Sequence, residues 1–174
     1  MQLGGSRRTR PLPTSPNHST CSSSPCPRRV VDVLEDAVEA RVRSALIFNA
    51  GFAKTGAEGL AIQAKIVDIA NSSGMHIGGP NTVGFVNFHA GIPATFFLPP
   101  GKPLREPGPV AIVSQSSGFA AYIDEQARAA GVHAGWLVAT GNEVNITVTD
   151  ASAYLVERPG VTVVACFSEA MQDG

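Results

Sequence analysis

A run of small polar residues follows an apolar stretch in VAIVSQSSG, residues 110–118. The apolar stretch predicts a buried strand that ends at Ser114, and the pattern behind it predicts a helix that starts near Ser117 and Gly118. Free backbone N–H groups and the positive end of the helix dipole would meet there and could bind an anion. The hydroxyls of Ser114, Ser116 and Ser117 would add further donors. The alternative is that a serine only caps the helix.

A carboxylate, Glu169, stands just after the apolar run VTVVACF at residues 161–167. This run predicts another strand, and parallel strands bring their carboxyl ends to one edge of a sheet. We therefore expect Glu169 at the same edge as the serine loop, where it could orient a histidine or accept a proton. The alternative is an ordinary solvated glutamate in a loop.

Two polar turns are further candidates. In GPNTVG, residues 79–84, glycines flank a Pro-Asn pair, which predicts a rigid turn where the backbone could approach a ligand closely. A purely structural turn explains the same residues. In ATGNEVNI, residues 139–146, Asn142 and Glu143 follow an apolar run and could serve either a ligand or a turn.

The elements that would position these residues alternate between helical and strand patterns. Helices are predicted over 30–42, 57–73, 117–130 and 147–158, and strands over 44–50, 75–79, 110–114, 134–140 and 161–167. On the second helix, the packed side is predicted to hold Leu60, Ala64, Val67 and Ala70. The alternation predicts an α/β protein with a parallel sheet.

Composition divides the chain into parts. Residues 1–28 are rich in Ser, Pro and Arg and poor in aliphatic residues, so we expect them to be disordered. LPPGKPLREPGP, residues 98–109, predicts a linker, which leaves residues 29–97 and 110–174 as two α/β units. The pattern starts and stops in mid-succession, with too few strands to complete either sheet. We therefore expect a sequence that is cut at both ends.

The charge balance and the hydropathy exclude several classes of partner. The chain has 13 Lys and Arg against 14 Asp and Glu, which argues against nucleic-acid binding. No run approaches the roughly 18–20 apolar residues of a membrane helix. The three cysteines lack metal-ligand spacing, so no metal site is expected and a reduced cytoplasmic protein is predicted. Cys166 lies in an apolar strand pattern and is expected to be buried.

The succession of motifs resembles a known family. IFNAGFAKTGAEG, GPNTVGFVN, GPVAIVSQSSGFAAY and TGNEVNITVTDASAYL, with a strand that leads to Glu169, are similar to the NDP-forming acyl-CoA synthetases, relatives of the succinyl-CoA synthetase α subunit. The similarity runs from about Val30 to Gly174. It implies a parallel-sheet, three-layer α/β architecture: the end of a CoA-binding Rossmann-type domain, then a truncated flavodoxin-like succinyl-CoA-synthetase domain.

The resemblance implies part of an acid–thiol ligase. Such an enzyme interconverts acyl-CoA, NDP and phosphate with acid, CoA and NTP through a phosphohistidine, which this chain would lack. The implied ligands are CoA or acyl-CoA and phosphate. In the complete enzyme, an ATP-grasp domain or subunit would bind ATP or ADP with magnesium. Two other interpretations stay open: a regulatory CoA or small-ligand module of a protein acetyltransferase-type fusion, and an inactive remnant.

The resemblance also implies roles for individual residues. The loop at residues 114–118 resembles the helix N-terminus that holds the phosphate of the phosphohistidine, and Glu169 resembles the acidic residue that orients that histidine. The turn that resembles the lining of the CoA site comprises Gly79, Pro80, Asn81 and Thr82. Ser117 stands where relatives more often have glycine, and Thr82 stands where many have cysteine.

Overall fold

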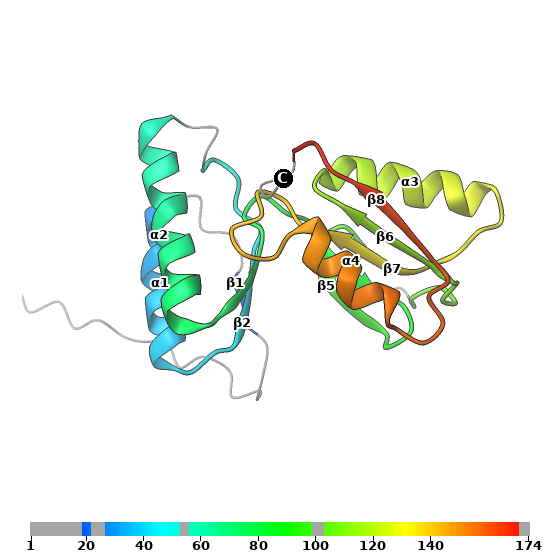
Figure 1. Ribbon diagram of the computed structural model, residues 1–174, viewed down its shortest axis with the longest axis horizontal. Coiled ribbons are helices and arrows are strands. Elements are labelled where there is room, and N and C mark those ends of the chain that lie inside the picture. The colour runs from blue at the N-terminus through cyan, green and yellow to red at the C-terminus, as the bar shows by residue number, and fades with distance from the viewer. Residues whose placement is uncertain (1–18, 22–26, 53–55, 99–102, 171–174) are drawn as a thin grey trace, which may run out of the picture.

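A computed structural model describes residues 19–21, 27–52, 56–98 and 103–170 (Figure 1). The rest of the chain, including most of the segment expected to be disordered, lies outside these ranges. The described residues form a three-stranded sheet of order β1-β2-β3 and a five-stranded sheet of order β5-β4-β7-β6-β8. The α/β class predicted from the sequence is confirmed. Within the described ranges, no helix has both the length and the apolar content that crossing a membrane requires.

The first unit is a parallel sheet with both of its helices on one side (Figure 1). Its elements are β1 (Ser19–Cys21), α1 (Pro27–Glu39), β2 (Ser44–Ile47), α2 (Ala57–Ser73) and β3 (His76–Gly78). Its core is formed by apolar side chains at helical and strand spacing, among them Leu34, Ile47, Ile66 and Ile77. Gly74 ends α2 with a left-handed backbone, at φ 69°, which glycine adopts without steric cost.

Two expectations for this unit differ from the structure. Residues 19–21 form a strand and α1 begins at Pro27, although 1–28 was expected to be disordered. Parallel pairing with β2 gives the backbone of this polar strand hydrogen-bond partners on one side. On α2 the buried residues include Ile62 and Ile66, whereas Leu60 is 55% exposed. This helix carries apolar residues of its own on all sides, so the periodicity of the sequence alone did not identify the face that packs on the sheet.

The second unit has helices on both faces of a mixed sheet. Its elements are β4 (Gly84–Asn87), β5 (Ile92–Thr95), β6 (Val110–Ser114), α3 (Ser117–Ala129), β7 (Ala134–Ala139), α4 (Val148–Val156) and β8 (Val163–Phe167). The central strand β6 runs parallel to β7 and β8. Its side chains alternate: Ile112 packs with α3, while Ala111 and Val113 pack with α4. This unit is the expected three-layer sandwich.

The hairpin β4–β5 is an element that the sequence did not predict. It lies within residues 29–97, yet β4 pairs antiparallel with β7 of the second sheet. Each of its strands has only four residues, which is too short for alternation to separate a strand from a turn. The predicted limits of the two domains stay a prediction.

Strand β8 forms one edge of the second sheet among the described residues. Its residues are half-buried or exposed, and Val163 is 52% exposed. Cys166, which the apolar pattern predicted to be buried, is an exposed free thiol 3.1 Å from the Ser152 hydroxyl. The prediction was wrong because a run of apolar residues does not distinguish a central strand from an edge strand.

Candidate functional site

The carboxyl ends of β6 and β8 and the start of α3 meet at one edge of the second sheet, on the side facing the first unit (Figure 1). Two backbone hydrogen bonds hold this edge together. The N–H of Gln115 donates to the Phe167 carbonyl at 3.0 Å, and that of Thr140 donates to the Ser114 carbonyl at 2.9 Å. The structure therefore brings the serine loop and the segment that carries Glu169 to the same place.

The three serines of the loop make different hydrogen bonds. Ser114 is fully buried, and its Oγ donates to the Ser116 carbonyl and accepts from the Ser116 N–H, so it shapes the loop from inside. Ser116 is the N-cap of α3, and its Oγ accepts from the Phe119 N–H at 3.3 Å. Ser117 Oγ accepts from the Val83 N–H at 3.2 Å, which ties the helix to the neighbouring turn.

Two backbone donors remain at the N-terminus of α3. The cap atoms of Ser116 take the N–H groups of Phe119 and Ala120. An α-helix leaves its first N–H groups without intrahelical partners, so those of Ser117 and Gly118 are the donors available to a ligand in this part of the structure. A Cβ added to Gly118 would meet nothing within 4 Å, so the approach is open. The geometry suits an anion.

The turn at residues 79–84 packs closely against both sheets. Gly79 has φ 97°, and a Cβ there would lie 2.5 Å from the Ile47 carbonyl oxygen, so only glycine fits. Thr82 is 2% exposed; its Oγ1 donates to the Ala139 carbonyl at 2.5 Å and accepts from the Gly84 N–H at 2.9 Å. Both candidates thus fix the shape of the turn.

Glu143 is a buried carboxylate, only 4% exposed, in the loop after β7. Its Oε1 accepts from the Thr140 hydroxyl at 2.7 Å and from the Val148 N–H, at the start of α4, at 2.8 Å. Its Oε2 accepts from Gln115 Nε2 at 2.7 Å. From the sequence, Glu143 could either bind a ligand or stabilise a turn. The described contacts show that its carboxylate joins three segments by hydrogen bonds.

Gln115 is a residue that sequence reasoning did not single out. Its Oε1 accepts from the N–H of Glu169 at 2.6 Å and that of Ala170 at 3.1 Å. Its Nε2 donates to Glu143 and to the Ala170 carbonyl, both at 2.7 Å. A polar side chain between serines gave no sign of this role, because its partners lie 28 to 55 positions away in the sequence.

The loop at residues 139–146 also contacts the first unit. Val144 packs into the core between the first sheet and its helices. Asn145 pairs with β3, its Oδ1 accepting from the Ile77 N–H at 2.8 Å and its Nδ2 donating to the Met75 carbonyl at 2.9 Å. The Asn142 amide receives a hydrogen bond from the Asn81 side chain at 3.3 Å. The candidate site therefore lies where the two units join.

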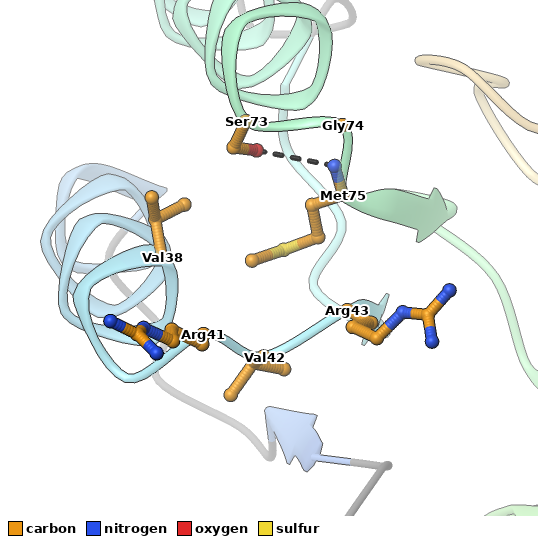
Figure 2. A pocket seen from close by; sticks show the side chains of 7 residues that line it. All are labelled: Val38, Arg41, Val42, Arg43, Ser73, Gly74 and Met75. Atoms are coloured by element: carbon orange, nitrogen blue, oxygen red, sulfur yellow. Dashed lines mark hydrogen bonds between the residues drawn. The ribbon is translucent and has the colours of Figure 1, made fainter.

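A separate pocket of about 300 Å³ lies at the opposite end of the first sheet (Figure 2). It is formed where α1 and α2 end and β2 and β3 begin, and Met75 lies inside it. The guanidinium groups of Arg41 and Arg43 extend away from each other, so they do not converge on one anion (Figure 2). Ligands of open α/β sheets collect at the carboxyl ends of strands, which this pocket does not reach.

Residues 107–174 match the family model described as the succinyl-CoA ligase like flavodoxin domain. The chain is 32% identical over 145 residues to the α subunit of an ADP-forming acetate–CoA ligase II from Pyrococcus furiosus. It is 29% identical over 147 residues to an ADP-forming 4-hydroxybutyrate–CoA ligase from Nitrosopumilus maritimus. These alignments cover 83% of this chain but 31% and 20% of those proteins. The chain thus spans about a third of their length or less.

Solved structures have the same fold. A protein from Pyrococcus horikoshii OT3 matches with a TM-score of 0.81 at 28% identity, over 93% of this chain and 36% of its own. The dinucleotide-forming acetyl-coenzyme A synthetase 1 of Ca. Korarchaeum cryptofilum, in complex with phosphate and ADP, matches with a TM-score of 0.80 at 24% identity, over 94% and 33%. The flavodoxin-like fold and the family resemblance predicted from the motifs are confirmed.

Proposed function

We propose that this chain, which resembles the NDP-forming acyl-CoA synthetases, forms the part of such an acid–thiol ligase that receives a phosphorylated histidine and CoA. The complete enzyme would interconvert acyl-CoA, NDP and phosphate with acid, CoA and NTP, and another segment would carry the histidine. The proposal depends on one observation. The N-terminus of α3 presents the backbone donors of Ser117 and Gly118 beside the segment that carries Glu169.

In this proposal the N-terminus of α3 holds the phosphate. The N–H groups of Ser117 and Gly118 would donate to its oxygens, and the helix dipole would favour its negative charge. The Ser116 hydroxyl accepts from Phe119 through its oxygen, so its proton can still donate to the phosphate. Phosphoryl transfer relies mainly on positioning and charge stabilisation, which this arrangement can supply without a nucleophile of its own.

Glu169 would orient the phosphorylated histidine. Its carboxylate is exposed at the edge where α3 begins, and a carboxylate accepts hydrogen bonds only. By accepting from one ring N–H, it would fix the tautomer and leave the other ring nitrogen to carry the phosphate. A histidine held in this way presents its phosphate to the helix end and not to water.

The turn formed by Gly79, Pro80, Asn81 and Thr82 would line the CoA site. Its backbone groups already bond to the protein: the Asn81 N–H donates to the Asn49 carbonyl at 2.9 Å, and the Pro80 carbonyl accepts from Asn142 at 2.8 Å. The turn would therefore contact CoA by van der Waals packing and through the polar side chain of Asn81. ATP or ADP with magnesium would bind to an ATP-grasp domain or subunit, and we place the enzyme in the cytoplasm.

Binding of CoA and of inorganic phosphate by the purified chain tests the proposal. A ligand that binds only the folded state at 100 times its Kd stabilises that state by about 2.7 kcal/mol, so each should raise the melting temperature. Gly118→Val should weaken phosphate binding at least about tenfold by placing a side chain in the open approach. Ala129→Val is the matched control, because it makes a similar change at the far end of the same helix.

The outcomes separate the proposal from its alternatives. Binding of CoA without phosphate would favour a regulatory CoA-binding module. Binding of neither ligand at millimolar concentration would contradict both binding roles and favour an inactive remnant. Equal loss of phosphate affinity in Gly118→Val and Ala129→Val would show that the helix end is not the site.

A further inference from the structure

We propose that Gln115, oriented by the buried carboxylate of Glu143, is the positioning residue that holds Glu169 at the phosphate site. The consequence for histidine binding rests on the proposed function above. The geometry does not, because the Gln115 side chain bonds to Glu143 on one side and to the backbone at 169 and 170 on the other. Glu169 itself would contact the histidine, and Gln115 would act only through it.

The polarity of the Gln115 amide is fixed from both sides. The backbone N–H groups of Glu169 and Ala170 are donors, so the amide atom that faces them must be the carbonyl oxygen. The NH₂ group then faces the Glu143 carboxylate and the Ala170 carbonyl, which both accept. Neither a carboxylate nor a shorter amide at this position could make the same set of bonds.

Glu143 in turn is held in one orientation. Its other oxygen accepts from the Thr140 hydroxyl and from the Val148 N–H at the first turn of α4, where the helix dipole favours a negative charge. Its backbone has φ 57°, a left-handed value that non-glycine residues rarely adopt. A strained backbone that places a buried carboxylate among three donors indicates a defined positioning role.

The chain of contacts reaches the other side of the site as well. The loop that carries Glu143 exchanges hydrogen bonds with the turn at residues 79–84: the Val144 N–H donates to the Gly79 carbonyl, and the Gly79 N–H donates to the Thr140 carbonyl, both at 3.1 Å. The position of Glu169 is therefore set by the same loop that contacts the proposed CoA turn. Glu169 would keep its place while its own side chain stays available to a ligand.

Exchanging the two side chains tests this arrangement. In Gln115→Glu, two carboxylates would face each other without a donor between them. In Glu143→Gln, the new NH₂ group would face Gln115 and turn that amide over, so that NH₂ meets the N–H groups of Glu169 and Ala170. The double variant Gln115→Glu/Glu143→Gln restores a donor facing an acceptor between the two side chains and at the N–H groups of Glu169 and Ala170, but it places a carboxylate oxygen opposite the Ala170 carbonyl, which must turn away. The double variant should recover much of the protection of the Glu169 and Ala170 amides that each single variant loses.

The first measurement is hydrogen exchange of individual amides in the purified chain. We expect protection of the Glu169 and Ala170 amides to fall about tenfold in each single variant and to return in the double variant. The amides of Ile112 and Leu137 in the central strands report whether each variant is folded. Unchanged protection at 169 and 170 in folded single variants would overturn the proposal.

The second measurement compares the affinities for 1-phosphoimidazole and inorganic phosphate. Only the first probe carries a second ring nitrogen, and this nitrogen donates to Glu169 when it is protonated. At a pH that protonates it, the wild-type chain should prefer the first probe, and Glu169→Gln should reduce that preference. Each single exchange variant should reduce the ratio at least about fivefold, and the double variant should restore it. A ratio that falls in Glu169→Gln but not in the single exchange variants would overturn the positioning role.

The two proposals fail in different ways. If the wild-type chain binds neither probe, the proposed function is wrong, and the exchange of the 169 and 170 amides alone decides whether Gln115 and Glu143 order the segment. If both probes bind and the amides stay protected in the single variants, the proposed function stands and the positioning role is wrong.

Discussion

The serines of residues 114–118 look equivalent in the sequence but make different contacts. The Ser114 hydroxyl makes its hydrogen bonds within the loop, Ser116 caps α3, and the Ser117 hydroxyl accepts from the Val83 N–H of the neighbouring turn. The sequence identified the strand, the loop and the helix start correctly, because those follow from local patterns. It could not assign the hydroxyls, because their partners depend on loop geometry and on a segment 34 residues away.

Replacing Ser116 separates its capping role from anion binding. Ser116→Ala removes the acceptor for the Phe119 N–H and should lower the free energy of unfolding by about 1 kcal/mol. Ser116→Asp keeps a capping oxygen, so stability should be retained, but its charge should weaken phosphate binding at least about tenfold. Urea unfolding and calorimetric titration with phosphate measure the two effects. Equal phosphate affinity in wild type and Ser116→Asp would contradict an anion site at this cap.

Gln115 and Glu143 show where residue-level prediction ends. The sequence singled out Glu143 only as a polar residue in a loop and did not single out Gln115. The carboxylate is buried because three donors surround it, and those donors come from the loop after β7, from α4 and from the serine loop. Burial of a charge is decided by such partners and not by residue type, so no local pattern could have revealed this pair.

At the scale of elements, agreement was best for one helix and one strand whose local patterns are clear. The predicted helix at 57–73 coincides with α2, which glycines flank at 56 and 74, and the predicted strand at 110–114 coincides with β6. The elements that were missed, β1 and the β4–β5 hairpin, are short and depend on pairing with distant strands. A three- or four-residue strand buries too little to produce a pattern of its own.

One ion pair connects the segment before β6 to helix α3. The Arg105 guanidinium bonds to both carboxylate oxygens of Asp124 and lies over the Phe88 ring, 4.2 Å from its centre. Both side chains are mostly buried, at 23% and 13% exposure. We expect Arg105→Ala to lower the free energy of unfolding by about 1–2 kcal/mol, because Asp124 loses a charged partner and Phe88 a packing contact.

A second arginine provides a matched control for this prediction. Arg158 also lies over an aromatic ring, that of Tyr154, but its nearest carboxylate, Glu157, is 3.9 Å away and 76% exposed. Arg158→Ala should therefore change the free energy of unfolding by at most about 0.5 kcal/mol. Urea unfolding of both variants measures the difference. Similar losses would mean that burial of the Arg105–Asp124 pair adds nothing.

At the scale of the whole molecule, the loop at residues 139–146 links the two units. It leaves β7 in the second sheet, places Val144 in the core of the first unit, and sets Asn145 against the backbone of β3. A residue that follows the second sheet therefore packs in the core of the first unit. The sequence predicted two consecutive units but not this exchange, because nothing in a polar loop indicates which core its single valine enters.

Asn145→Ala tests the link between the units. It removes hydrogen bonds to the Ile77 N–H and the Met75 carbonyl and leaves both groups unpaired, so stability should fall by about 2 kcal/mol. Asn87→Ala is the control, because the Asn87 side chain accepts a hydrogen bond from the nearby Ala90 N–H at an exposed position, and its loss should cost no more than about 0.5 kcal/mol. Denaturant unfolding distinguishes the two. Equal small losses would show that the contact with β3 contributes little.

The packing of Val144 in the first unit also predicts how the molecule unfolds. Because Val144 belongs to the core of the first unit, the two sheets should melt in one transition. Scanning calorimetry should give equal calorimetric and van't Hoff enthalpies. Two resolved transitions would show that the units are independent in spite of their contacts.

The position of Val144 and Asn145 limits how this chain could be rearranged by recombination. The proline-rich stretch at 98–109 looks like a natural crossover point between two inherited modules. A hybrid made there would pair a first module with a foreign 139–146 loop, whose residues must still fit the first core and the edge of β3. Functional chimeras should therefore be recovered when that loop and the β7 strand that pairs with β4 travel with the first module, which makes the unit of exchange discontinuous in the gene.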